Sequence, residues 1–187
     1  MTLTRSTIEE KAEEYAEEEP LYPVEQEAIE TYPAAFVDGE FGFRDAEWVV
    51  QWHYRRFLGA YPDREHREGE ARFGENDRAA VREAVVDAAN ADALDVRIEH
   101  LTELRGVDLS VASAFLQFID PERYVAVDRR TWDALWEAGE LDDPYPDSLS
   151  VEEYRRFLDT CRAVADEHDA DCWTLYRALW RLGSEDR

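Results

Sequence analysis

The chain has 187 residues, enough for one ordinary domain or for two small helical lobes that share a core. Its formal net charge is −24, but six Trp, nine Tyr and eight Phe exclude a disordered acidic chain, which would be poor in aromatic residues. Two cysteines exclude a disulfide framework and an iron–sulfur cluster. With no signal sequence and no apolar run of about 20 residues, we expect a cytoplasmic protein without a membrane segment.

The charge has an unusual composition. Lys11 is the single lysine among 21 basic residues, against 45 acidic ones. Lysine depletion combined with a carboxylate-rich surface is typical of proteins that stay soluble in multimolar salt, so the sequence indicates a halophilic source. The alternative is that the chain is acidic in order to bind a cationic partner.

Hydrophobic residues recur at helical spacing nearly throughout, and no internal repeat occurs, so we expect an all-α fold in a single domain over 1–187. An acidic helix or arm is expected over 1–20, and C-terminal helices over 128–187. Further helices are expected, in chain order, over 23–32, over 45–60, from an Asn76 cap, over 94–104 and 110–119, and from caps at Asp128, Ser150 and Asp171, with Gly183 ending the last.

Two segments depart from this helical pattern. Residues 62–74 are polar, contain glycine and carry both charges, which predicts a long loop. Residues 123–127, "RYVAV", are the one segment expected to be extended.

The segment 94–119 is the least generic part of the sequence. It predicts two helices joined by "RGVD", in which Gly106 forms a tight turn and Val107 points down between the helices. Asp108 is expected in a left-handed conformation, which Asp tolerates better than most residues. The second helix would then direct free backbone N–H groups outward, which suits a phosphate and gives a helix-hairpin-helix that binds DNA without reading its sequence. The alternative is a plain helix–helix turn.

The run "L-R-G-V-D-L-S-V-A-S-A-F-L", followed by Asp128 near the start of a helix, resembles the helix-hairpin-helix DNA glycosylase superfamily. Three motifs are similar to those of a less characterised branch of this superfamily: Ala112-Ser113-Ala114-x-Leu116, Asp120-Pro121-x-x-Tyr124 and Asp128-x-Arg130. The resemblance covers about 35 residues tightly and implies a compact helical domain of that type, built either as one body or as two lobes with the hairpin and Asp128 at the cleft between them.

The resemblance also implies roles for single residues. Asp128 falls on the catalytic aspartate, which would stabilise positive charge on deoxyribose or activate water. Ser110 falls where bifunctional members carry the lysine that forms a Schiff base, so strand cleavage by that route is not expected. Asp108 replaces a glycine and places a carboxylate beside the expected phosphate. The DNA-binding candidates are Arg105, Gly106, Val107, Asp108, Ser110, Arg129 and Arg130.

Each of these roles has a simpler structural alternative. Asp128 is a helix N-cap candidate whatever its chemistry. Arg129 and Arg130 could meet phosphates or pair with the surplus carboxylates. Three tryptophans could line a pocket for an extruded base or belong to the core: Trp48, Trp52 and Trp132.

The function expected from the sequence is therefore DNA repair by a monofunctional DNA N-glycosylase, with DNA as the partner and no metal or cofactor. No HExxH motif and no Cys/His pair at ligand spacing occurs. The alternative is a non-catalytic protein of the same fold that acts in binding or scaffolding. In multimolar salt, affinity from Lys/Arg–phosphate contacts is weak, so backbone hydrogen bonds, shape and stacking would carry more of the binding.

Overall fold

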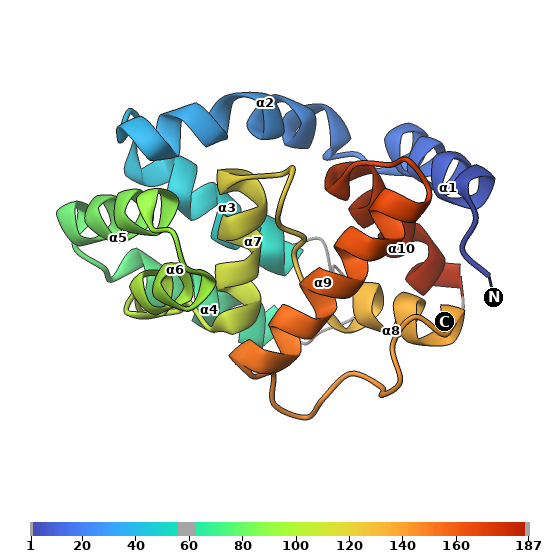
Figure 1. Ribbon diagram of the computed structural model, residues 1–187. Helices are drawn as coiled ribbons and strands as arrows, with labels where there is room; N and C mark the ends of the chain where they lie inside the picture. Colours follow the sequence, from blue (N-terminus) through green and yellow to red (C-terminus); the bar gives the residue numbers. More distant parts are fainter. Residues whose placement is uncertain (1, 56–62, 186–187) are drawn as a thin grey trace. The chain divides into compact units, whose positions relative to one another are not determined.

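The computed structural model describes residues 2–55 and 63–185, in which every regular element is a helix. The all-α prediction is therefore confirmed for this part of the chain (Figure 1). The helices form two compact units. Unit 1 combines residues 1–28 with 121–187, and unit 2 comprises residues 29–120, so the boundary falls inside one helix and again before Pro121. None of the described helices is long and apolar enough to cross a membrane.

Unit 1 contains the two ends of the chain. Its helices are α1 (Arg5–Glu18), the first part of α2 (Tyr22–Asp38), α8 (Arg129–Ala138), α9 (Val151–Glu167) and α10 (Cys172–Glu185). Helix α10 packs against α1, α8 and α9 and so forms the centre of this unit. The core around it is aromatic: Tyr15 of α1 makes edge contacts with Trp173 and Tyr176, and its hydroxyl donates to the buried carboxylate of Glu25 at 2.9 Å.

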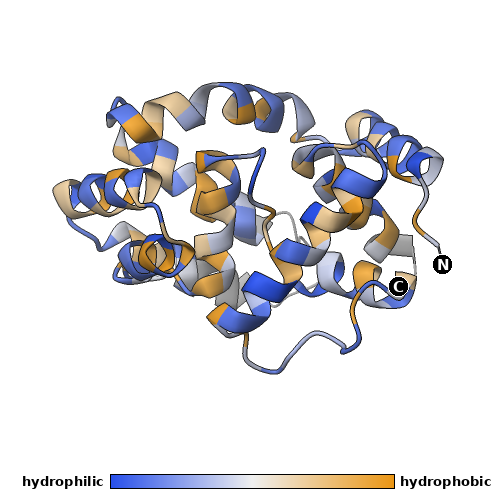
Figure 2. Ribbon diagram, viewed as in Figure 1, coloured by the Kyte–Doolittle hydropathy of each residue, from blue (hydrophilic) through white to orange (hydrophobic). Residues whose placement is uncertain are grey.

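Unit 2 contains the rest of α2 together with α3 (Phe43–Arg55), α4 (Asp63–Gly74), α5 (Arg78–Asn90), α6 (Leu94–Thr102) and α7 (Leu109–Ile119). Helix α7 packs against α3, α5 and α6, and its residues from Val111 to Ile119 are all buried. Figure 2 shows that hydrophobic residues predominate along α7, as expected of a buried helix. Phe118 of α7 contacts the rings of Trp48 and Trp52 at 5.2 and 4.9 Å.

The prediction of a long loop over 62–74 is wrong, because residues 63–74 form helix α4. Glu, Arg and Ala are good helix formers, and their polar content hid the helix from a pattern search that depends on repeated apolar residues. Phe73 fixes α4 to the core through a ring stacked on Phe43 at 5.5 Å. A single aromatic anchor leaves no periodic signal in the sequence.

Two helix ends also differ from the prediction. Helix α2 continues through Pro33 to Asp38. An internal proline removes only one backbone donor, and the packing of the rest of the helix can compensate for that loss. Gly183 lies inside α10 instead of ending it. A Cβ atom at Gly183 would collide with the backbone of Arg130, so this glycine permits the close approach of α10 to α8.

The N-terminal caps predicted at Asp128 and Ser150 are confirmed, and both form capping boxes. Residues 124–127 of the segment that was expected to be extended lie outside any helix and are buried. The expected helix over 45–60 corresponds to α3, and its residues 56–60 lie outside the described part of the chain.

Candidate functional site

The hairpin between α6 and α7 depends on Gly106. This residue has φ +77°, the left-handed conformation that glycine adopts most easily. A Cβ atom here would lie 2.5 Å from the carbonyl oxygen of Gly69 and 2.8 Å from the backbone nitrogen of Phe73, both in α4. The backbone of the hairpin therefore packs directly on the backbone of α4. Val107 is buried beside this contact, as expected of a side chain that points down between helices.

The expected left-handed conformation of Asp108 is wrong. Asp108 is extended, with φ −88° and ψ −177°, and it is the N-cap of α7. Its Oδ1 accepts a hydrogen bond from the backbone N–H of Val111 at 2.9 Å. The turn takes its left-handed residue at Gly106, which leaves Asp108 in the extended conformation that an N-cap requires. A carboxylate thus occupies part of the helix terminus that was expected to meet a phosphate.

The remaining hairpin candidates have different surroundings. The exposed guanidinium of Arg105 pairs with Glu75 at 3.3 Å. Ser110 lies half-buried in the first turn of α7, where its carbonyl accepts a hydrogen bond from the hydroxyl of Ser113 at 2.6 Å. No lysine stands at this position to form a Schiff base with a sugar.

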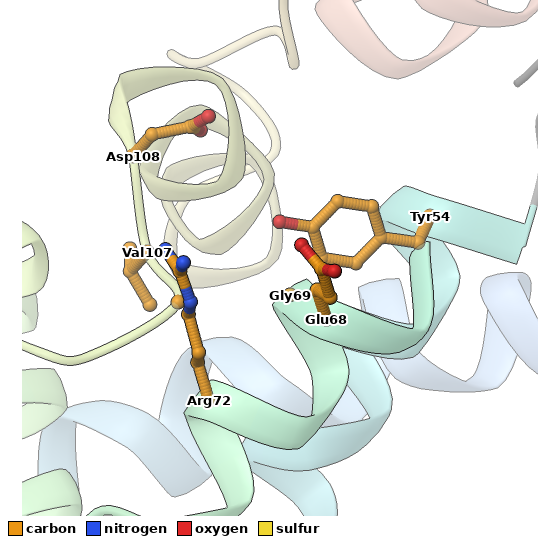
Figure 3. A pocket seen from close by; sticks show the side chains of 7 residues that line it. Tyr54, Glu68, Gly69, Arg72, Val107 and Asp108 are labelled. Carbon is orange, nitrogen blue, oxygen red and sulfur yellow. The ribbon is translucent and has the colours of Figure 1, made fainter. Parts of the chain in front are cut away.

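A pocket of about 310 Å³ opens between the hairpin, α4 and the end of α3 (Figure 3). Its lining is mostly polar: Tyr54, Glu68, Gly69, Arg72, Gly106, Val107 and Asp108. The Tyr54 ring packs on the backbone of Gly69, where a Cβ atom would collide with it. Burial and, after it, the charge of Asp108 raise the pKa of Tyr54 to about 12, against an opposing effect of Arg72. The Tyr54 hydroxyl therefore remains a hydrogen-bond donor at neutral pH.

Asp128 belongs to unit 1, where it caps helix α8. Its Oδ1 accepts the backbone N–H of Thr131 at 2.9 Å, and the Thr131 hydroxyl accepts the backbone N–H of Asp128 at 3.2 Å. Only 3% of Asp128 is exposed. The carboxylate is thus held in a fixed orientation, and it is largely removed from solvent.

The two arginines after Asp128 lie against aromatic rings. The guanidinium of Arg129 lies 5.1 Å from the centre of the Tyr145 ring, and that of Arg130 lies 4.0 Å from the centre of the Trp180 ring. Arg129 is exposed, whereas Arg130 is partly buried. Both side chains are therefore used by unit 1 in cation–π contacts.

The tryptophans proposed as a base pocket are mainly core residues. Trp132 is fully buried in unit 1, where it stacks on Phe157 at 5.8 Å and donates its Nε1–H to the carbonyl of Asp143 at 2.9 Å. Trp52 is 2% exposed in the core of unit 2. Trp48 is half-buried in the same unit, with its ring against Tyr32 and Phe118. The geometry favours the core alternative for Trp52 and Trp132.

The candidate residues therefore form two groups. Hairpin residues 105–110 belong to unit 2, together with Trp48 and Trp52, whereas Asp128, Arg129, Arg130 and Trp132 belong to unit 1. A cleft between lobes remains a prediction. Sequence reasoning missed the pocket residues Tyr54, Glu68 and Arg72, which no motif marks. The pair Gly69 and Gly106 was the available signal, because glycines often mark close backbone approach.

Comparison with solved structures identifies the architecture. Two structures of an 8-oxoguanine DNA glycosylase from Methanocaldococcus jannaschii superpose on 92% of this chain. One is a glycosylase/lyase in complex with a 15mer DNA containing 8-oxoguanine, with TM-score 0.51, 17% identity and 95% of its own chain covered. The other has TM-score 0.52 and 16% identity, and 92% of its own chain is covered. This chain has a helical DNA glycosylase fold.

The likeness lies in the fold alone, since sequence identity is low. Comparison of the sequence with protein-family models and with curated proteins finds no match. The hairpin and the cap at Asp128 are thus features of a chain whose sequence has diverged far from these glycosylases.

Proposed function

We propose that this protein is a monofunctional DNA N-glycosylase that removes a damaged base, with Asp128 as the catalytic carboxylate. The observation that carries the proposal is the combination of a helical glycosylase fold with a fixed, buried aspartate that begins a helix. The resemblance of the segment 104–130 to that superfamily supports the same assignment.

In the proposed reaction, water adds to C1′ of deoxyribose while the C1′–N bond breaks. The base departs with the bonding electrons and takes up a proton, and an abasic site remains. The transition state carries positive charge on the sugar, which a nearby carboxylate stabilises, and the same carboxylate can accept the proton of the attacking water. The hydrogen bond from the Thr131 N–H keeps Asp128 in one orientation for this task.

Strand cleavage through a Schiff base is not part of the proposal. That chemistry needs an amine, and a serine occupies position 110. Treatment of the reaction with borohydride should therefore trap no covalent protein–DNA adduct, even where base release is observed.

The experiment is a single-turnover assay of base release in multimolar KCl, on duplexes that carry 8-oxoguanine and a panel of other lesions. Asp128→Asn should lower the rate of release by about 100-fold or more, the usual contribution of an acid–base group. Asp171→Asn is the matched control, because Asp171 caps α10 of the same unit through the N–H of Thr174. Absence of release from every duplex, or equal rates for wild type and Asp128→Asn, would overturn the proposal.

A second candidate function is DNA binding or scaffolding without catalysis. It is favoured by the 3% exposure of Asp128 and by the Asp108 carboxylate at the start of α7. In that case Asp128→Asn leaves all function intact. Binding of DNA in multimolar salt that is lost on Gly106→Ala would identify a binder, whereas no DNA binding by either protein would identify a scaffold.

A further inference from the structure

A groove of about 360 Å³ lies between the end of α2 and one face of α5, in unit 2. Residues 38 and 39 form one wall, and the face of α5 between Ala79 and Asp87 forms the other. Figure 1 shows the end of α2 beside α5, and we call this surface the α2–α5 groove. None of its residues belongs to the hairpin or to the surroundings of Asp128, so what it binds does not depend on the proposed function.

Two side chains of α5 hold the walls of the α2–α5 groove together. Arg82 Nε donates to the carbonyl of Gly39 at 3.0 Å, and Asn90 Nδ2 donates to the carbonyls of Val37 and Val86 at 3.1 and 2.9 Å. Gly39 has φ +69°, and a Cβ atom there would lie 3.1 Å from Arg82 Nη2 and 3.3 Å from Val86 Cγ2. The groove is thus formed without a ligand, which lowers the entropic cost of binding one.

The charges of the α2–α5 groove are not balanced. Its carboxylates, from Asp38, Glu83 and Asp87, are exposed, and none of them makes a hydrogen bond or ion pair with another described side chain. Arg82 is the one cation of the lining, and its guanidinium is bonded to the carbonyl of Gly39 instead. Glu83 and Asp87 also lie one turn apart on α5, where like charges destabilise a helix. A cationic ligand would therefore relieve repulsion in this groove.

The lining also limits which cation fits. A metal ion is not indicated, because the described residues contain no group of three or more side chains that could hold one. Ala79 and Val86 contribute apolar surface to the groove, and Val37, which precedes Asp38, is 41% exposed. A ligand that covers such a lining needs an apolar part as well as a charge. An arginine side chain has both, since an aliphatic stem carries a planar, weakly hydrated guanidinium that bonds carboxylates.

We propose that the α2–α5 groove is the docking site of a partner protein, which inserts an arginine side chain with its stem on Val86 and its guanidinium at the carboxylates of Glu83 and Asp87. Charge complementarity selects this partner, because the three carboxylates of the groove repel phosphates. A second copy of the chain is disfavoured for the same reason, since each copy carries a net charge of −24. In multimolar salt the attraction between charges is screened, so the apolar contact of the stem carries more of the affinity.

The test measures binding of short fluorescein-labelled Ala/Gly peptides to the full chain by anisotropy in multimolar KCl. The peptides carry a central arginine, lysine or citrulline, and citrulline keeps the shape of arginine without its charge. The arginine peptide should bind most tightly, and an equal concentration of spermidine should displace little of it. Glu83→Gln and Asp87→Asn should each weaken its binding about two- to fivefold, the range of an exposed ion pair. Ala79→Tyr, at an exposed helix position, should fill the groove and abolish binding without a change of charge.

Glu99→Gln is the matched control, because Glu99 is an exposed glutamate of α6 in the same unit and lies outside the groove. It removes the same charge as Glu83→Gln, so non-specific attraction to an acidic surface would fall equally in both variants. Thermal unfolding followed by circular dichroism checks that the variants remain folded. Equal weakening by Glu83→Gln and Glu99→Gln, equal affinity for the lysine or citrulline peptide, displacement by spermidine, or no binding of the arginine peptide would overturn the inference.

Discussion

Asn76 and Arg105 are joined by two hydrogen bonds that fix the hairpin to the end of α4. The backbone N–H of Arg105 donates to Asn76 Oδ1 at 2.9 Å, and Asn76 Nδ2 donates to the carbonyl of Arg105 at 3.0 Å. Nδ2 also donates to the carbonyl of Phe73 at 2.9 Å. One amide side chain thus bonds to the backbone of both segments, as a neighbouring strand would.

Asn76→Asp is expected to destabilise the hairpin, because the carboxylate keeps the acceptor for Arg105 N–H but cannot donate to the two carbonyls. The free energy of unfolding, measured by urea denaturation, should fall by about 1–3 kcal/mol, the usual cost of unmade hydrogen bonds. Asn90→Asp is the control, since Asn90 Nδ2, at the end of α5, also donates to two carbonyls, which belong to Val37 and Val86 and not to the hairpin. Only Asn76→Asp should also weaken binding of DNA. Equal loss of DNA binding in both variants would contradict the proposed role of the Asn76–Arg105 hydrogen bonds.

Asp108→Asn is expected to strengthen DNA binding without loss of stability. Asn is as good an N-cap as Asp, so the free energy of unfolding should change by less than about 0.5 kcal/mol. Removing one negative charge beside the hairpin should lower the Kd for duplex DNA most at low salt, where exposed charges are least screened. Anisotropy over a range of KCl concentrations measures this. Asp171→Asn, at the exposed cap of α10 in unit 1, makes the same change outside the unit that holds the hairpin and should leave Kd unaltered.

Gly106→Ala and Gly139→Ala provide a test of close backbone packing. Both glycines have positive φ, at +77° and +82°, so both substitutions carry the left-handed penalty of about 1–2 kcal/mol. Only Gly106 has backbone atoms of α4 within 3 Å of the added Cβ, whereas Gly139 has no atom within 4 Å. Gly106→Ala should therefore lower the urea midpoint clearly more than Gly139→Ala. Equal midpoints would show that the hairpin can shift away from α4.

Tyr54 makes the stability of the folded state depend on pH in the alkaline range. Its folded-state pKa of about 12 is higher than the unfolded value, so the folded state binds the proton more tightly. The corresponding stability is complete below about pH 10, the unfolded value, and is lost as the pH rises toward the folded one. Burial also raises the pKa of Tyr15 and of Tyr154, so the loss of stability of the wild type at alkaline pH contains contributions from all three tyrosines. Tyr54→Phe should reduce the fall in urea midpoint over this range. An unchanged slope would contradict the assigned environment.

The sequence predicted the features that depend on local chemistry. Asp128 and Ser150 were identified as caps because a capping side chain and the N–H that it accepts lie three residues apart. Gly106 was identified as the turn because its conformation is a property of the residue itself. The same local reasoning failed at Asp108, two residues after Gly106, because the turn takes its left-handed residue at Gly106 and Asp108 is extended as the N-cap of α7.

Features that join distant segments could not be predicted in this way. Asn76 was expected to cap α5, but Asp77 is the cap, and Asn76 instead bonds to Arg105, 29 residues further along the chain. The pocket beside the hairpin needs Tyr54 of α3, Glu68 of α4 and Asp108 together, and no spacing in the sequence relates them. Tertiary packing determines these contacts, so only the structure reveals them.

Two substitutions separate the contribution of Asp128 to stability from any contribution to catalysis. Asp128→Asn keeps the cap, so the free energy of unfolding should change by less than about 0.5 kcal/mol. Asp128→Ala leaves the Thr131 N–H without its acceptor in a buried place, at a cost of about 1–3 kcal/mol. Asp171→Ala, at the exposed cap of α10, should cost less, because water can replace the lost acceptor. Urea denaturation measures all three. Equal losses from the two alanine variants would mean that Asp128 is more accessible than its 3% exposure indicates. Normal stability of Asp128→Asn would then allow any loss of base release to be attributed to the carboxylate itself.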